Sequence, residues 1–327
     1  MVGLLVPAAL VVVGLVGCGG DDERTVTLRL VAYDSFPTAD TPLNTALDEF
    51  TDRTGIDVSI VVAGEAGTMV TKAVLTSGRP EGDVMWGVDN TLLSAAVDGR
   101  VFDGDPVTVD TGDVCVNYDI EWFASRGIPP PQTLDDLLRP EYADLLVVQD
   151  PSTSSPGLAF LLATVAGTDD WRAWWTAARA NGVDVVDSWT TAYYDRFSGS
   201  GGGDRPLVVS YATSPPAEVV FASPPRDTAR TAVSTGTCFR QIEYAGVLRG
   251  TAHPDEARQL IEFLRSERFQ RELPLTLFVN PVNPDVELPE VFRRFAAFPE
   301  NPFTLEPEVI AANRAAWQDE WNDIVLR

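Results

Sequence analysis

Short apolar runs alternate along residues 26–97 with segments in which apolar residues recur at helical spacing. Leu43, Ala46, Leu47 and Phe50 recur every three or four positions, and Gly55 follows them as a stop signal. Such an alternation of strands and helices is typical of an α/β lobe. The predicted strands are 26–33, 57–62 and 83–86, and the predicted helices are 43–50, 69–76 and 91–97.

A second series begins after residue 113 and has the same character. Its last helices carry clear apolar stripes, one with Ala257, Leu260, Ile261 and Leu264 on a single face. The chain that follows the N-terminal segment has about 310 residues, long for one hydrophobic core, so two lobes are expected. The predicted strands are 114–118, 145–149, 183–186, 207–211 and 240–248, and the predicted helices are 132–138, 171–180, 254–263 and 306–326.

The N-terminus carries an apolar run over residues 2–16, too short for a comfortable membrane span but suited to a signal peptide. It ends in Leu15-Val16-Gly17-Cys18, which resembles the lipobox of bacterial lipoproteins. That resemblance implies cleavage before Cys18, a lipid on its sulfur, and an extracytoplasmic protein anchored to the cell membrane. Residues 1–17 would be the signal peptide and 18–25 a tether; a plain secretory signal is the alternative. No Lys or Arg precedes the run, which departs from the usual pattern.

A net charge of −24 argues against nucleic acid as a partner, because nucleic-acid binding needs a basic surface. An acidic surface is compatible with a small cationic ligand. His253 is the only histidine, so neither a histidine-based zinc site nor a Ser-His-Asp triad is expected, and we predict no bound metal. Apart from Cys18, the chain has Cys115 and Cys238, which would form a disulfide or remain two buried thiols.

A run of hydroxyl residues follows the strand that ends at Gln149. Ser154 and Ser155 lie at the start of an apolar, helical segment, and Gly157 follows them. Free N–H groups at a helix N-terminus attract an anion, so this turn is a candidate ligand site, although serine there is also an ordinary cap.

Five short motifs occur in an order that resembles the periplasmic thiamine-binding proteins of ABC importers, and the similarity runs from Val26 to Trp321. The resemblance implies an α/β, type II-like solute-binding fold with two lobes, each a central sheet flanked by helices, and a ligand in the cleft between them. Lobe 1 would hold 26–112 and 242–300, and lobe 2 would hold 113–241 and 301–327. The motifs are Tyr33-Asp34-Ser35-Phe36, Gly87-Val88-Asp89-Asn90-Thr91-Leu92-Leu93, residues 149–158, residues 188–193 and residues 209–215.

The implied function is capture of thiamine, thiamine monophosphate or thiamine diphosphate and delivery to an ABC permease and its ATPase. The protein would be a monomer without cofactor or enzymatic activity. Thiamine combines a flat aminopyrimidine with a cationic thiazolium, so aromatic rings can stack on it and carboxylates can pair with its charge. By motif position, the implied ligand-binding residues are Tyr33, Asp34, Ser35, Asp89, Asn90, Ser154, Ser155, Gly157, Trp189, Tyr211, Ser214 and Phe278.

The sequence departs from the family where some relatives carry tryptophan, with Asp40 and Phe278 at those positions. The resemblance also implies two hinge strands side by side, with a hinge near Gly112 and Gln241. Cys115 and Cys238 would then lie at corresponding ends of these strands and form a disulfide.

Two other functions remain open at this point. Tyr193-Tyr194 is an adjacent pair of the kind that ferric-iron-binding relatives use as phenolate ligands. A secreted enzyme with Asp34 and Asp89 as an acid–base pair is the second alternative, although no nucleophile–base pattern accompanies these two residues.

Overall fold

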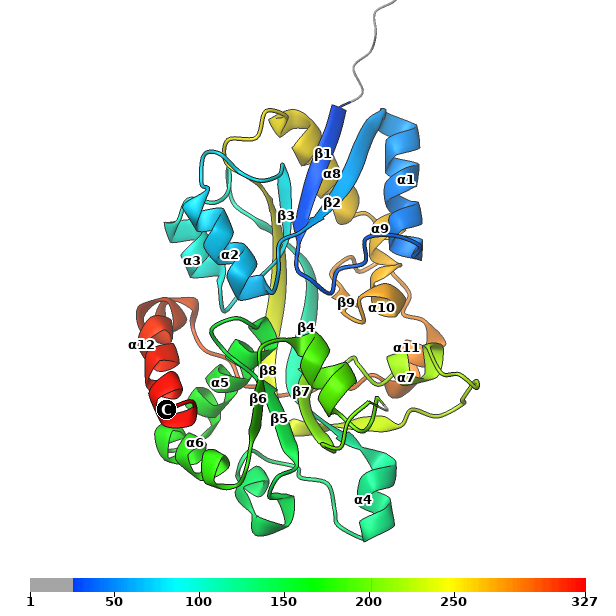
Figure 1. Ribbon diagram of the computed structural model, residues 1–327. Coiled ribbons are helices and arrows are strands. Elements are labelled where there is room, and N and C mark those ends of the chain that lie inside the picture. Colours follow the sequence, from blue (N-terminus) through cyan, green and yellow to red (C-terminus); the bar gives the residue numbers. More distant parts are fainter. Residues whose placement is uncertain (1–25, 201) are drawn as a thin grey trace, which may run out of the picture.

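The computed structural model describes residues 26–200 and 202–327, and Figure 1 shows two lobes joined by long strands. The signal segment and Cys18 lie outside the described residues. Lobe 1 begins with β1 (Val26–Ala32), α1 (Pro42–Thr54), β2 (Ile56–Val62), α2 (Ala66–Leu75), β3 (Val84–Asp89) and α3 (Leu93–Asp98). Lobe 1 is completed by α8 (Pro254–Leu264), α9 (Glu267–Gln270), α10 (Leu273–Thr276) and β9 (Asn280–Pro281).

Lobe 2 lies below lobe 1 in Figure 1. The long strands β4 (Val107–Asp119) and β8 (Thr231–Val247) run through both lobes. The elements of lobe 2 are α4 (Ile120–Arg126), η1 (Asp135–Leu138), η2 (Pro140–Tyr142), β5 (Leu146–Gln149), α5 (Ser155–Gly167), α6 (Trp171–Ala180), β6 (Asp184–Val186), η3 (Thr191–Arg196), β7 (Leu207–Tyr211), α7 (Ala217–Val220), α11 (Glu290–Phe295) and α12 (Pro307–Val325).

One mixed sheet passes through both lobes in the order β2-β1-β3-β8-β4-β7-β5-β6, and β9 pairs with β4. In lobe 1 the strands β1, β2 and β3 are parallel, with α2 and α3 on one face and α1 on the other (Figure 1). In lobe 2, β5 is parallel to β6 and β7, while α5, α6 and α12 cover one face. The expected α/β architecture with a central sheet flanked by helices is therefore confirmed.

The capping of α1 follows the sequence closely. Thr41 and Asn44 form a reciprocal capping box, and Gly55 ends the helix with a φ of 71°, a left-handed conformation that favours glycine. The apolar stripe of the helix is buried, as its spacing predicts. Trp321, which we expected in the core through the stripe of the last helix, is also buried and lies 5.4 Å from Trp175, ring centre to ring centre.

The two long strands were predicted only in part. β4 begins at Val107 instead of 114, and β8 begins at Thr231 instead of 240. Asp110 and Asp113 interrupt the apolar pattern of β4, yet both are buried, so the pattern hid the first half of the strand. The expected helix at 132–138 is only the single 3₁₀ turn η1.

β4 and β8 pair side by side at the junction of the lobes, and Gly112 lies opposite Gln241 in their register. Cys115 and Cys238 are joined by a disulfide between these strands, with their Cα atoms 4.1 Å apart and both side chains buried. The main-chain N–H of Ala297 donates to the carbonyl of Ala212. This contact indicates that the chain returns to lobe 2 before residue 301, the boundary expected from the sequence.

Within residues 26–200 and 202–327, no helix combines the length and apolar character needed to cross a membrane.

Candidate ligand-binding site

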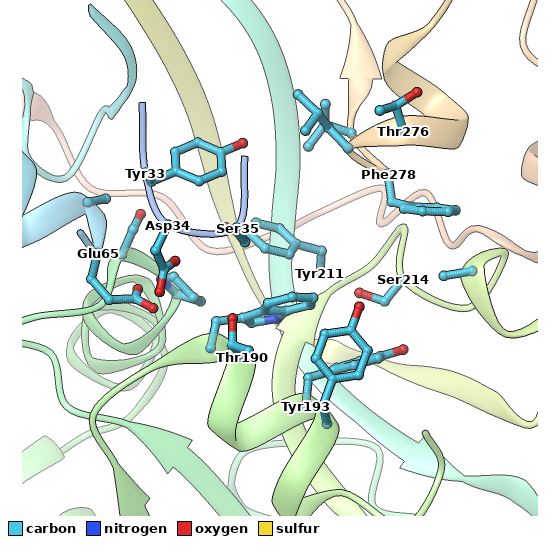
Figure 2. A pocket seen from close by; sticks show the side chains of 18 of the residues that line it. Tyr33, Asp34, Ser35, Glu65, Thr190, Tyr193, Tyr211, Ser214, Thr276 and Phe278 are labelled. Atoms are coloured by element: carbon cyan, nitrogen blue, oxygen red, sulfur yellow. The ribbon is translucent and has the colours of Figure 1, made fainter. Parts of the chain in front are cut away.

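A cavity of about 420 Å³ lies between the lobes, within the range of small-molecule sites of roughly 300–1,000 Å³. Figure 2 shows its wall, with Tyr33, Asp34, Ser35 and Glu65 from lobe 1 facing Thr190 and Tyr193 from lobe 2. The residues expected at the ligand that do line the cavity are Tyr33, Asp34, Ser35, Ser155, Trp189, Tyr211, Ser214 and Phe278. Those that do not are Asp89, Asn90, Ser154 and Gly157.

Trp189 is fixed in the wall from two sides. Its indole Nε1–H donates to Ser210 Oγ at 2.9 Å, and its ring stacks on Tyr193 with centres 5.0 Å apart and planes 18° apart. Ser210 is itself 2.9 Å from Ser214, so the motifs at 188–193 and 209–215 meet through hydroxyl groups. Trp189 is held in one orientation because its polar atom and one ring face both have partners.

The ring of Tyr33 packs directly against Gly87, a glycine of another motif. Gly87 has a φ of 98°, and a Cβ there would lie 2.3 Å from Cδ1 of the Tyr33 ring. Only glycine combines this backbone conformation with the close approach. Burial, and next the charge of Glu243, hold the pKa of Tyr33 well above its usual value, so its hydroxyl remains protonated.

Phe278 closes the opposite side of the cavity (Figure 2). Its φ of 56° is unusual for a residue with a side chain, and Thr213 Oγ1 donates to its carbonyl. Its ring lies edge to face with Phe221, with centres 5.6 Å apart. Asp40, the other position where some relatives carry tryptophan, does not line this cavity; it lies near Arg268 on the outside of lobe 1.

Two carboxyl groups of the wall, Glu65 and Glu243, were not expected from the sequence. Burial raises the pKa of Glu65 to about 8, and the negative charge of Asp34 adds to this shift. Glu65 follows β2 closely, and loops at the carboxyl ends of parallel strands are common ligand-binding positions. The position of Glu65 just after a predicted strand is the sequence signal that could have identified it as a site residue.

Glu243 belongs to a row of acidic residues across three strands. It is paired with Asp89 of β3 on one side and Asp110 of β4 on the other. Burial, followed by the charge of Asp89, raises the pKa of Glu243 to about 8. Burial and Glu243 likewise hold the pKa of Asp110 well above its usual value. In sequence, Glu243 is a single acidic residue inside an apolar strand, which by itself signals no ligand site.

The four expected residues outside the wall have structural partners or close packing. Asp89 Oδ1 accepts from the N–H groups of Thr91 (2.8 Å) and Leu92 (3.1 Å), and Asn90 Oδ1 accepts from the N–H of Ile242 at 2.9 Å. Ser154 is the N-cap residue of α5 through its main chain, because its carbonyl accepts from the N–H of Leu158 at 3.0 Å, while its hydroxyl has no hydrogen-bond partner among the described residues. At Gly157 a Cβ would lie 2.5 Å from the carbonyl oxygen of Gln149, so this glycine is needed for helix–strand packing.

The sequence pattern described as "Bacterial extracellular solute-binding protein" matches residues 98–299. The chain belongs to this family. It is 29% identical over 325 residues to the thiamine-binding periplasmic protein of Salmonella typhimurium (strain LT2), covering 95% of this chain and 97% of that protein. Among solved structures, "Periplasmic thiamin binding protein" superposes with a TM-score of 0.80 at 27% identity, covering 92% of this chain and 96% of that one.

A ferric binding protein from Campylobacter jejuni superposes with a TM-score of 0.68 at 14% identity over 91% of this chain and 99% of that one, which shows the shared fold alone. In this solute-binding protein the Tyr193 hydroxyl donates to Glu218 Oε1 at 2.8 Å, while Tyr194 is exposed. Burial first, and then Glu218, raises the pKa of both tyrosines, which disfavours the phenolate form. Among the described residues no group of three or more His, Cys, Asp or Glu side chains is arranged to hold a metal ion. The tyrosine pair is therefore poorly arranged for iron.

Proposed function

We propose that this solute-binding protein captures thiamine in the cavity between its lobes and delivers it to an ABC importer without chemical change. The observation that carries the proposal is the character of the cavity wall, which combines aromatic rings with carboxyl groups. The aromatic members include Tyr33, Trp189, Tyr211 and Phe278, and the acidic ones are Asp34, Glu65 and Glu243.

These residues match the two halves of thiamine. Aromatic faces stack on flat heterocycles, and the attraction between a ring face and a cation contributes ~0.5–2 kcal/mol for the thiazolium. Carboxylates balance the positive charge and accept from the exocyclic amine. Relatives named as thiamine-binding support the same ligand, because the similarity extends over nearly the whole chain.

Ligand binding should favour closure of the lobes, because a ligand that contacts both lobes stabilises the closed arrangement. The register of Gly112 and Gln241 between the lobes supports the hinge proposed there. We further propose that the protein acts as a monomer and presents its closed form to the permease.

Isothermal titration calorimetry with thiamine, thiamine monophosphate and thiamine diphosphate tests the ligand class. We expect saturable heat with thiamine and a higher melting temperature in its presence, because a ligand that binds only the folded state stabilises it. Absence of both heat and thermal shift with all three compounds would reject thiamine binding. A visible absorption band after incubation with ferric iron would instead favour the iron-binding alternative.

We also propose that a lipid at Cys18 anchors the protein to the outer face of the cell membrane, on the evidence of the Leu15-Val16-Gly17-Cys18 motif. A single acyl chain holds a protein only marginally, so stable anchoring needs the several chains of a mature lipoprotein. We expect Cys18→Ala to release the protein into the medium or leave it unprocessed. Membrane fractionation and intact mass measure this, and an unchanged membrane fraction with an unchanged mature mass would contradict it.

A further inference from the structure

The three acidic residues of the cavity wall differ in their access to water. Asp34 is exposed and Glu65 is half-buried, so water can solvate either carboxylate, whereas Glu243 is only 4% exposed. Glu243 lies in β8, where the two hinge strands pair. An ionised carboxylate is costly to bury without donors or a cation, so the groups around Glu243 decide its protonation state.

Glu243 is the middle member of a row of three buried carboxyl groups. It pairs across the sheet with Asp89 of β3 and with Asp110 of β4. Directly paired residues share a face of the sheet, and their Cβ atoms lie about 4.5–5.5 Å apart. Asp89 and Asp110 are 0% and 1% exposed, so bulk water does not screen the row. The three groups cannot all be ionised, because like charges at this spacing repel strongly in a buried place.

The members of the row have unequal supplies of hydrogen-bond donors. Asp89 Oδ1 accepts from two N–H groups and one hydroxyl of the turn that follows it. Glu243 Oε1 accepts a single bond, from Gln241 Nε2 at 3.1 Å. Glu243 Oε2 and both oxygens of Asp110 have no donor within the described part of the chain. Asp89 is therefore the member best able to remain ionised, and Asp110 is the least able.

The other titratable groups near Glu243 do not supply a positive charge for it. Tyr33 and Tyr211 line the same cavity, and burial, followed by the charge of Glu243, holds the pKa of both hydroxyls well above the usual value. The positive charge of Arg314, on α12, favours the ionised form of Asp89. Burial and then the charge of Asp89 raise the pKa of Glu243 to about 8, so this carboxyl is mainly protonated at pH 7.

We propose that Glu243 is protonated in the empty cavity and that a cationic ligand displaces this proton, so that capture is coupled to proton release. This rests on the proposed function. The O–H bond of Glu243 breaks, the proton passes to solvent, and the carboxylate left behind pairs with the positive charge of the ligand. Asp110 keeps its own proton and, as the cross-strand neighbour, is placed to donate to the new carboxylate. Acid therefore weakens binding, because the proton and the ligand compete for one carboxyl group.

Isothermal titration calorimetry with thiamine in two buffers of different ionisation enthalpy, such as PIPES and Tris, measures the protons released. At pH 7 we expect about 0.5–0.9 proton per thiamine bound, since a group with a pKa of about 8 is mostly protonated there. The dissociation constant of thiamine should fall at least about fivefold from pH 6 to pH 7.5. Saturable heat without proton release would overturn the inference.

Glu243→Gln identifies the group, since it removes the titrating proton and keeps the shape. We expect proton release to fall below about 0.2 per thiamine, and thiamine affinity to lose its dependence on pH. Asp110→Asn is the matched control, because it replaces a buried carboxyl that stays neutral throughout, and it should keep the wild-type release. If Glu243→Gln binds thiamine and still releases the wild-type number of protons, the exchange belongs to another group, such as Glu65, and the inference is wrong.

Melting curves without ligand test the resting state and do not depend on the proposed function. A carboxyl group whose pKa is raised in the folded protein binds its proton more tightly than in the unfolded chain, so stability falls as the pH rises toward that pKa. From pH 5 to pH 8, the melting temperature of Glu243→Gln should therefore fall less than that of the wild-type protein, by up to about 2 °C per pH unit. Equal falls in the two proteins would show that Glu243 is not protonated at rest, and would overturn the inference even if thiamine binds. Absence of any heat with thiamine would reject the proposed function instead, and the release step with it.

Discussion

Replacing Cys115 and Cys238 together with alanine should lower the melting temperature by about 3–8 °C. The disulfide closes a loop of 123 residues between the two hinge strands, and a loop of this length is worth up to ~4–5 kcal/mol in the chain-entropy model. Losing a native disulfide typically costs about 2–5 kcal/mol. An unfolding entropy of roughly 2 cal/mol/K per residue makes each kcal/mol worth about 1.5 °C in a chain of this size.

Differential scanning calorimetry of the wild-type protein and the double variant, each with and without a reducing agent, measures this effect. The reducing agent should lower the wild-type melting temperature toward that of the variant and leave the variant unchanged, which serves as the control. A count of free thiols in the denatured, unreduced protein should find neither Cys115 nor Cys238 reactive. Two reactive thiols, or equal melting temperatures for both proteins, would contradict the bond.

Most of the fold could be predicted from periodicity because one face of each element is buried. The stripe of α1 and the strand β7 were expected at nearly the observed positions. The hinge strands were harder. Asp110 and Asp113 are buried in β4, where alternation predicts apolar residues, and the missed first half of β8 contains the polar run Ser234-Thr235-Gly236-Thr237. Glu243 lines the cavity and is paired with Asp110 in the sheet, while Asp113 forms an ion pair with Arg240. A pattern of hydrophobic positions contains no information about these partners.

The candidate site residues were predicted from the family motifs and not from the spacing of hydrophobic positions. Trp189 by itself would be assigned to a core on composition, but its indole bonds to Ser210 and its ring lines the cavity. The same motifs also supplied Asp89 and Asn90, whose side chains bond to main-chain groups near the hinge instead. A family motif identifies functional positions, but it does not distinguish residues that contact the ligand from residues whose hydrogen bonds hold the cavity wall in shape. Glu65 was missed because it lies outside the motifs.

Tyr211→Ala should weaken thiamine binding by ~1–3 kcal/mol, roughly 5- to 150-fold in the dissociation constant, the range for losing a rigid aromatic anchor. Tyr211 ends β7 in the cavity wall, with its ring 6.5 Å from that of Trp189. Gly112 leaves room for it, because a Cβ there would lie 3.2 Å from the Tyr211 ring. The ring is therefore already positioned before the ligand arrives, and little entropy is lost when it stacks.

Tyr118→Ala is the matched control, because Tyr118 is a half-buried tyrosine of β4 in the same sheet but outside the cavity wall. Its ring packs edge to face on Phe123, with centres 5.9 Å apart, so its loss should lower the melting temperature and leave thiamine affinity unchanged. Tyr211→Phe should keep most of the affinity, since stacking needs the ring and not the hydroxyl. Calorimetric titration and melting curves on all three variants separate the two roles. If Tyr211→Ala lowers the melting temperature as Tyr118→Ala does while thiamine affinity stays at the wild-type value, Tyr211 packs the sheet and does not bind the ligand.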